Sequence, residues 1–292
     1  MLQWTFAAAH AVRQTRIPLL HEVRLPMMKF LWPVLLSGLS FGAVAQTADS
    51  DDESPGGPPR GWQLGVAAAV FESIYAGEGT RVMPIPLVNY EGERFWFRGI
   101  SAGWTVLNLG AFELAAVAKL RFDGFEVKDL GRRELARNGL DYRLLDDRDE
   151  AVDVGVTMKW SGRAGEIEAE ILADATDKSG GQELQIEYGY PIELGQATLT
   201  PNIGATWQSK DMANYYYGTL PKEVARGVID YKPGAVTIGH VGLSYFRPLG
   251  EKWSMMGEVE YSRLPDEIKK SPFVEPGTNG RVSMFVGFSR AF

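Results

Sequence analysis

A histidine close to a serine is a common arrangement for nucleophilic catalysis, and residues 240–244, HVGLS, contain both residue types. In such a pair the histidine takes the proton of the serine hydroxyl, which activates the oxygen for attack. In a β-strand His240 and Ser244 share a face, but at that spacing they are too far apart for a direct hydrogen bond. We therefore interpret His240 as a structural residue. The chain has no cysteine, so thiol catalysis and cysteine metal sites are excluded.

A second candidate site is acidic. Residues 146–150, DDRDE, offer four carboxylates, and oxygen ligands of this kind bind Ca²⁺ and Mg²⁺. The same composition is typical of a solvated loop, which is the interpretation that we favour. The sequence accordingly predicts no metal site and no cofactor.

Three adjacent tyrosines, Tyr215, Tyr216 and Tyr217, form a third candidate site within the polar stretch 209–235. Exposed aromatic rings can stack on sugar or anchor a protein partner, whereas other aromatic rings pack on neighbouring loops. Both interpretations are open at this stage. The residues that follow predict a short helix, with Thr219 as N-cap, Pro221 in the first turn and Gly227 as the stop.

The candidate residues stand among segments in which apolar and polar side chains alternate, as they do in β-strands. In residues 281–292, for example, Val282, Met284, Val286 and Phe288 share one face, and the opposite face is small and mostly polar. This alternation suits a soluble sandwich or a membrane barrel. Aromatic residues near strand ends favour the barrel, because such rings gather at the two membrane interfaces; they are Trp62, Trp160, Trp207, Tyr245, Trp253 and Tyr261.

The connections between these segments are of two kinds, tight turns and long polar loops. Tight turns are expected at 161–165, 193–196 and 248–252, and long loops at 124–150, 209–235 and 264–280. Bacterial outer-membrane barrels have short turns on the periplasmic side, long loops outside and an even number of strands. An even number requires a break at Gly99-Ile100. We therefore predict an all-β fold: a transmembrane antiparallel β-barrel of about twelve strands, over residues 61–292, with outer-membrane lipid around it.

In such a barrel the polar faces of the strands line the lumen. The predicted lumen charges are Lys119, Arg121, Lys159, Glu168, Glu170, Glu183, Glu187, Glu258 and Glu260. One interpretation is an internal network of salt bridges that fills the barrel, and we favour it. The other is a narrow pore that prefers cations.

The first 60 residues have a different character. Residues 28–45 contain Lys29, a short apolar stretch and Ala43-Val44-Ala45, which together are typical of a secretory signal peptide. We expect residues 1–45 to be an N-terminal extension and signal peptide, with Met28 as a candidate true start, and residues 46–60 to be a disordered acidic linker. Without residues 1–45 the chain has 26 basic and 36 acidic residues, a net charge of about −10, which argues against a nucleic-acid partner.

Four segments of the chain resemble the MipA/OmpV family of outer-membrane proteins. The segments are RVMPIPLVNYEGERFWFRG (81–99), LLDDRDEAVDVGV (144–156), DMANYYYGTLPKEVARGVIDYKPGA (211–235) and WSMMGEVEYSRLPDEIKKSPFV (253–274). The resemblance covers residues 61–292 and implies a location in the cell outer membrane. For some members it implies a scaffold that holds a murein-cleaving lytic transglycosylase near a peptidoglycan synthase. Other members are described as pore-like, adhesive or osmotically responsive, and the family has no agreed catalytic residues.

Three functions follow from these observations. A scaffold for the peptidoglycan machinery is the leading hypothesis, on the family resemblance. A narrow, cation-leaning pore or small-solute channel is the alternative, on the lumen charges. An outer-membrane hydrolase is a distant third hypothesis. We therefore expect that the chain is not an enzyme.

Overall fold

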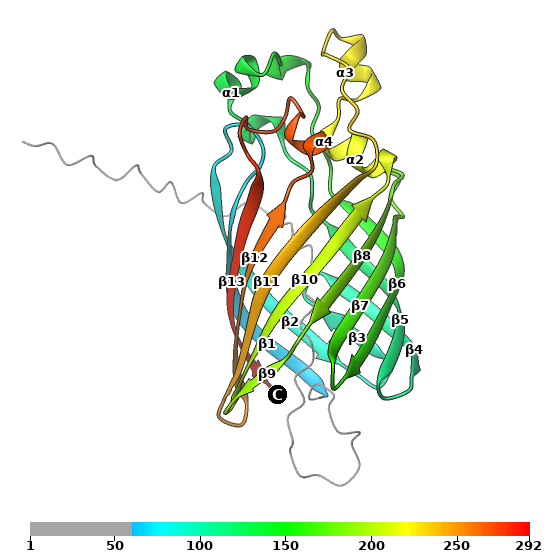
Figure 1. Ribbon diagram of the computed structural model, residues 1–292, viewed down its shortest axis with the longest axis vertical. Helices are drawn as coiled ribbons and strands as arrows, with labels where there is room; N and C mark the ends of the chain where they lie inside the picture. Colours follow the sequence, from blue (N-terminus) through cyan, green and yellow to red (C-terminus); the bar gives the residue numbers. More distant parts are fainter. Residues whose placement is uncertain (1–59) are drawn as a thin grey trace, which may run out of the picture. The chain divides into compact units, whose positions relative to one another are not determined.

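The computed structural model describes residues 60–292, and these fold into one closed antiparallel sheet with the longer loops gathered at one end (Figure 1). The predicted leader and nearly all of the predicted linker lie outside the described residues. Consecutive strands pair along the sheet, and the last strand pairs with the first from Gln63↔Ala291 to Phe71↔Ser283. The sheet therefore closes on itself into a barrel. In the described part of the chain no helix is long and apolar enough to cross a bilayer.

The strands are β1 (Gly61–Glu72), β2 (Thr80–Glu91), β3 (Phe95–Arg98), β4 (Ser101–Asn108), β5 (Phe112–Arg121), β6 (Ala151–Gly162), β7 (Gly165–Asp174), β8 (Gln182–Gly189), β9 (Ile192–Leu194), β10 (Ala197–Gln208), β11 (Val236–Leu249), β12 (Trp253–Arg263) and β13 (Gly280–Ala291). The helices are α1 (Arg132–Arg137), α2 (Lys210–Tyr217), α3 (Pro221–Ala225) and α4 (Asp266–Lys269), with 3₁₀ turns η1 (Val127–Asp129) and η2 (Tyr142–Leu144).

The barrel wall has twelve strands, as predicted. Both β8 and β9 pair with β10, at Asn202–Gln208 and at Ala197–Leu199 respectively, so they are two parts of one strand interrupted at Tyr190-Pro191. The predicted break at Gly99-Ile100 is also confirmed, because β3 and β4 pair as a hairpin on either side of it. Gly99 has φ +59°, a left-handed conformation that glycine adopts at little cost.

The two faces of the wall differ as the alternation predicts. Apolar side chains of β1, β2, β12 and β13 stand exposed on the outside, including Val66, Val82, Val259 and Val286. Trp62, Trp160, Trp207, Trp253 and Tyr261 are exposed near strand ends. An apolar outer band with aromatic residues at its borders is the surface that hydrocarbon and lipid headgroups solvate.

Loops and turns lie at opposite ends of the wall. The connections 73–79, 122–150, 175–181, 209–235 and 264–279 gather at one end, which we name the cap end, and the helices α1 to α4 lie there (Figure 1). The tight turns other than Gly99-Ile100, and the end of the chain, lie at the other end, which we name the turn end.

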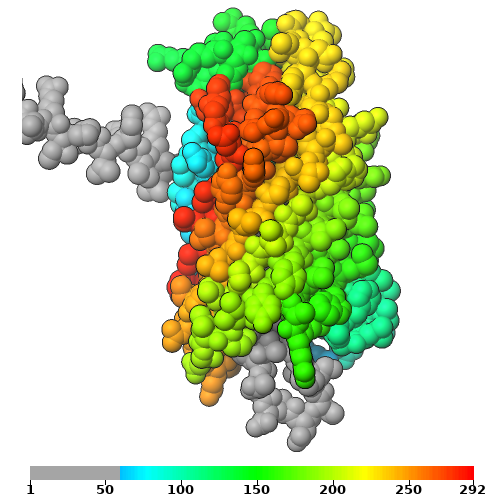
Figure 2. All heavy atoms as spheres, in the orientation of Figure 1, coloured from blue at the N-terminus to red at the C-terminus, as the bar shows by residue number. Residues whose placement is uncertain are grey.

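Four of these connections, all except 175–181, pack into a layer with its own hydrophobic core, and we name this layer the cap. Side chains from all four loops are buried together, among them Tyr75, Phe125, Tyr216 and Phe273. In Figure 2 the segments coloured green, yellow and orange touch one another over this end. The prediction of simple polar loops is therefore wrong, because their scattered apolar residues meet in a common core once the strands bring the loops together.

Candidate functional site

Arg121 holds three carboxylates on the lumen face of the wall, close to the cap. Its Nε lies 2.6 Å from Asp153 Oδ2, and its Nη1 lies 2.5 Å from Asp123 Oδ2 and 2.9 Å from Glu183 Oε2. The Gln208 amide also donates to Glu183, at 3.0 Å. All these side chains are buried, where charge-assisted hydrogen bonds are strong. They tie β5, β6, β8 and β10 together across the lumen.

The remaining predicted lumen cations also meet carboxylates. Lys119 Nζ donates to Glu170 Oε1 at 2.7 Å. Lys159 Nζ lies 3.0 Å from Glu166 Oε2. Glu168 lies between these two glutamates on the lumen face of β7.

The strands β8, β11 and β12 carry the other predicted lumen groups. His240 Nε2 lies 3.3 Å from Glu187 Oε2, and the ring lies over Gly204, where an added Cβ would be 2.3 Å from Nε2. The Ser262 hydroxyl donates to Glu260 at 2.7 Å. Glu258 faces the lumen beside Glu260, two residues away on the same strand.

His240 and Ser244 do not form a catalytic pair in the structure. The histidine is hydrogen-bonded to Glu187, and the partner of Ser244 Oγ is the Asn202 amide at 3.5 Å. The arrangement fits the structural interpretation of His240.

The charges occupy only part of the lumen wall, and the rest of it is apolar. On β1, β2, β12 and β13 the buried apolar lumen-facing residues are Ala67, Ala69, Phe71, Leu87, Met256 and Phe285, with Met83 and Ile85 packed against them. On β3, β5 and β7 a smaller cluster contains Trp96, Ala115, Val117 and Leu172. The lumen face therefore has apolar clusters between its charged groups, and Phe285 of one cluster lies directly opposite Glu258.

The three tyrosines lie in helix α2 rather than in an open loop. Ser209 caps this helix, and its Oγ accepts from the backbone N of Met212 at 3.4 Å. Tyr216 is 0 % exposed and Tyr217 is buried beside it, and burial raises the pKa of the Tyr217 hydroxyl. The binding interpretation is therefore wrong for these two residues, because no ligand can reach them in this packing. Tyr215 is half-buried, and its hydroxyl accepts from the backbone N of Asp149 at 2.9 Å.

Arg148 lies at the centre of the cap. The side chains of Arg148 and Glu223 are both 0 % exposed, and two nitrogens of the first meet the two carboxylate oxygens of the second at 2.9 Å each. Arg148 also donates to the backbone oxygens of Tyr215, Asp146 and Gly218, at 2.6, 2.7 and 3.0 Å. Its guanidinium lies 5.2 Å from the ring centres of both Phe125 and Phe273. One side chain thus joins three loops.

The acidic segment 146–150 is consequently not a simple solvated loop, because its central arginine is fully buried. Its carboxylates pair with cations of the protein: Asp146 with Arg226 at 2.5 Å, and Asp149 with Lys178 at 2.8 Å. The hydrogen bond from Arg226 lowers the pKa of Asp146. Among the described residues no group of three or more acidic or histidine side chains is arranged to hold a metal ion.

These features define a class of protein: an antiparallel barrel of twelve strands, apolar outside, with long loops at one end and short turns at the other. That is the architecture of bacterial outer-membrane β-barrels. The solved porin NanC is similar in fold, with a TM-score of 0.43 and 11 % identity over 78 % of this chain and 100 % of that chain.

The sequence comparisons identify the family. Residues 64–292 match the family described as MltA-interacting protein MipA. The chain is 33 % identical to the MltA-interacting protein of Escherichia coli K12 over 224 residues, which are 76 % of this chain and 87 % of that protein. It is 27 % identical to the outer membrane protein OmpV of Vibrio cholerae over 144 residues, which are 49 % of this chain and 56 % of that protein. The chain therefore belongs to the MipA family, and it is an outer-membrane protein. Because barrels of this class have long extracellular loops and short periplasmic turns, we assign the cap end to the extracellular side and the turn end to the periplasmic side.

Proposed function

We propose that this protein is an outer-membrane scaffold that binds a lytic transglycosylase through its periplasmic turns. The observation that carries the proposal is the similarity to the MltA-interacting protein, which extends over 87 % of that protein's length. A peptidoglycan synthase is the second partner that the family resemblance implies. The scaffold would hold the two enzymes near each other at the inner surface of the outer membrane.

The charges of the turn end support this location for the partner. Charged side chains stand exposed at the turns, among them Glu93, Arg94, Arg163, Glu251 and Lys252. Exposed charges at an interface rim steer a partner and fix its orientation. The turn surface lies on the side of the membrane where peptidoglycan is, and the cap lies on the other side.

The arrangement of the lumen is less favourable to the alternative, a pore. Lys119, Arg121 and Lys159 are each paired with a carboxylate, and the cap core lies over the extracellular end. The observation in favour of a pore is the excess of lumen carboxylates, with Glu258 and Glu260 on one strand. Acidic side chains that line a pore attract cations.

A binding experiment with two matched charge swaps tests the scaffold. The turn variant combines Glu251→Lys and Lys252→Glu. The control combines Glu126→Lys and Lys128→Glu, an ion pair of the cap at the opposite end. The purified lytic transglycosylase of the same organism is passed over the immobilised proteins. We expect the turn variant to bind at least several-fold less enzyme and the control to bind like the unchanged protein.

Two outcomes contradict the proposal. The unchanged protein retains no murein enzyme, or the cap variant loses binding while the turn variant keeps it. Ion conductance of the unchanged protein in planar bilayers decides separately whether the lumen is a pore.

A further inference from the structure

The wall of the barrel is incomplete along one strand. β2 pairs with β1 over its full length, from Thr80 to Glu91, but with β3 only through Asn89, Tyr90 and Glu91. The β3–β4 hairpin turns back at Gly99-Ile100. From Arg81 to Leu87 the second edge of β2 has no strand partner among residues 60–292. At about 3.3 Å per residue this free edge is roughly 23 Å long.

The chain on the other side of this free edge comes from β5 and the cap. Leu120 donates its backbone N–H to Ile100 O at 3.0 Å, so β5 ends just beyond the hairpin. The chain then crosses to the loop between β1 and β2, where the Tyr75 hydroxyl donates to Asp123 O at 3.0 Å and Gly131 N donates to Ala76 O at 2.9 Å. We name the interval between Arg81–Leu87 and residues 121–124 the seam. The hairpin closes its periplasmic end and residues 125–131 close its extracellular end.

Two prolines make the free edge unsuitable for another β-strand. Gly99 N donates to Val88 O at 3.2 Å, so the even-numbered residues of β2 direct their backbone groups toward the seam. In an antiparallel strand the N–H and C=O of one residue point to the same side. Along the free edge these residues are Val82, Pro84 and Pro86, and proline has no N–H to donate. The edge therefore resists pairing with a partner strand.

The seam instead adjoins apolar surface on both of its faces. Outward, Val82, Pro84 and Pro86 are exposed. On the lumen side, Met83, Ile85 and Leu87 belong to the apolar cluster that β1, β2, β12 and β13 share. Lumens of outer-membrane barrels are typically polar, so an apolar lumen surface beside a gap in the hydrogen bonding is unusual. An acyl chain that inserted beside this unpaired edge would contact apolar side chains on both faces of β2.

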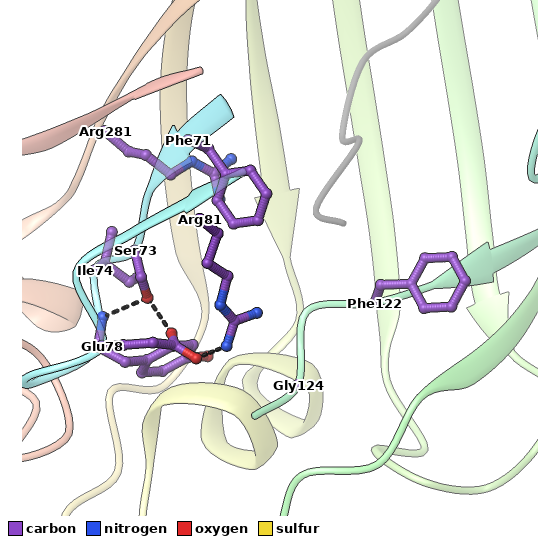
Figure 3. Close-up of a pocket in the computed structure, with 9 residues that line it drawn as sticks. Phe71, Ser73, Ile74, Glu78, Arg81, Phe122, Gly124 and Arg281 are labelled. Atoms are coloured by element: carbon purple, nitrogen blue, oxygen red, sulfur yellow. Dashed lines mark hydrogen bonds and ion pairs between the residues drawn. The ribbon is translucent and has the colours of Figure 1, made fainter. Parts of the chain in front are cut away.

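Two arginines, Arg81 and Arg281, lie at the extracellular end of the seam together with Glu78. A cavity of about 10 Å³ lies there, lined by Phe71, Arg81, Phe122, Gly124 and Arg281 among others. Figure 3 shows Arg81 and Arg281 near Phe71 on one side, and Phe122 on the other side with its ring directed away from them. Arg81 is ion-paired with Glu78. The cavity itself has room for about one water molecule, so a larger ligand has to lie along the seam.

We propose that the seam is a lateral binding site for an acyl chain of an outer-leaflet lipid. The chain enters between β2 and residues 121–124 and lies against Met83, Ile85 and Leu87. The headgroup stays at the extracellular end, near Arg81 and Arg281. The bilayer is the source of the ligand because Val82, Pro84 and Pro86 of the unpaired edge are exposed on the lipid-facing side of the wall.

Photolabelling of the unchanged protein tests this site. The protein is placed in vesicles of phosphatidylethanolamine and phosphatidylglycerol that contain a phospholipid with a diazirine on its acyl chain, and adducts are mapped by mass spectrometry. We expect adducts on the lumen-facing residues Met83 and Ile85, in addition to the outward-facing Val66. Gln185 and Thr206, which face the lumen from a fully paired part of the wall, should carry none.

A variant then tests the route. Met83→Glu places a charge on the apolar path and should lower the adduct yield at Ile85 at least fivefold, while the yield at Val66 stays unchanged. Gln185→Glu is the matched control and should change neither yield. The proposal is overturned if only outward-facing residues are labelled, or if Gln185 and Thr206 are labelled as strongly as Ile85. The map of the unchanged protein decides the question even if Met83→Glu fails to fold.

Discussion

Arg148→Met should loosen the cap while the barrel stays closed. The substitution removes the cation from a pair in which both side chains are fully buried. It leaves Glu223 with hydrogen bonds from the backbone N of Leu220 and Asp146, at 2.7 and 2.8 Å, but without a counter-charge. It also removes donors from the backbone oxygens of Tyr215 and Gly218. Methionine fills much of the same space, so the change is mainly electrostatic.

The size of the effect follows from the burial of the pair. Breaking a buried ion pair by removing one partner costs about 3–5 kcal/mol. Since about 1.4 kcal/mol corresponds to a tenfold change in an equilibrium, the cap should open at least roughly 100-fold more often. Adding Glu223→Gln should recover part of the loss, because the amide keeps an acceptor oxygen for Leu220 and no longer needs a cation.

Hydrogen exchange followed by mass spectrometry measures the protection of backbone amides in the cap and in the wall separately. Peptides from residues 122–150 and 209–235 should lose protection about 100-fold, and peptides from β6 and β11 should keep theirs. Arg143→Met is the control, because the Arg143 side chain is 75 % exposed and its ion pair is long, at 3.8 Å. If Arg148→Met changed cap protection by less than threefold, the central role of this arginine would be refuted.

Two further predictions concern the wall and the pH dependence of the cap. Val286→Arg places a charge on the lipid face near the middle of β13 and should lower the free energy of unfolding by about 2–4 kcal/mol. Ser283→Arg faces the lumen opposite Glu260 and should lower it less. Urea unfolding in lipid measures both variants, and the reverse order would show that the two faces are assigned the wrong way round. Asp146 has a pKa lowered by its hydrogen bond from Arg226, so its contribution to cap stability is present above about pH 4 and is lost as the pH falls through the lowered value. Exchange protection, corrected for intrinsic rates, should therefore fall from pH 5 to pH 3, and less so in Asp146→Asn.

The wall could be predicted from the sequence because each strand carries its own evidence. In β13, side chains alternate between lipid and lumen residue by residue, so the faces follow from local order. The break at Gly99 followed from the requirement that both ends of the wall lie on one side. The sequence did not show that the β3–β4 hairpin pairs only with Asn89, Tyr90 and Glu91 of β2. That extent depends on the register between strands, which local order does not reveal.

The cap could not be predicted because its contacts join distant residues. Arg148 stands among carboxylates and looks solvated, yet its partners lie 67 and 75 residues away in the sequence. Helix α2 had a local signal that was missed, namely Ser209 as its N-cap. The predicted short helix is confirmed as α3, but Leu220 rather than Thr219 precedes it. Thr219 Oγ1 instead accepts from the backbone N of Tyr231 at 2.8 Å, so the backbone of a later loop competes for the predicted cap.

The cap and the seam are structurally coupled. Residues 125–131, which close the extracellular end of the seam, contribute Phe125 and Leu130 to the cap core. Phe125 packs in that core, and its ring centre lies 4.8 Å from the ring centre of Tyr75. The Arg148 guanidinium lies over the Phe125 ring. Loss of the Arg148 pair should therefore also free residues 122–131, and lipid adducts at Ile85 should increase. The periplasmic turns are at the opposite end of the wall, and the strands that they join should remain paired in Arg148→Met. Binding of the murein enzyme should then persist in Arg148→Met, and the lipid site and the scaffold surface would be separable by a single substitution.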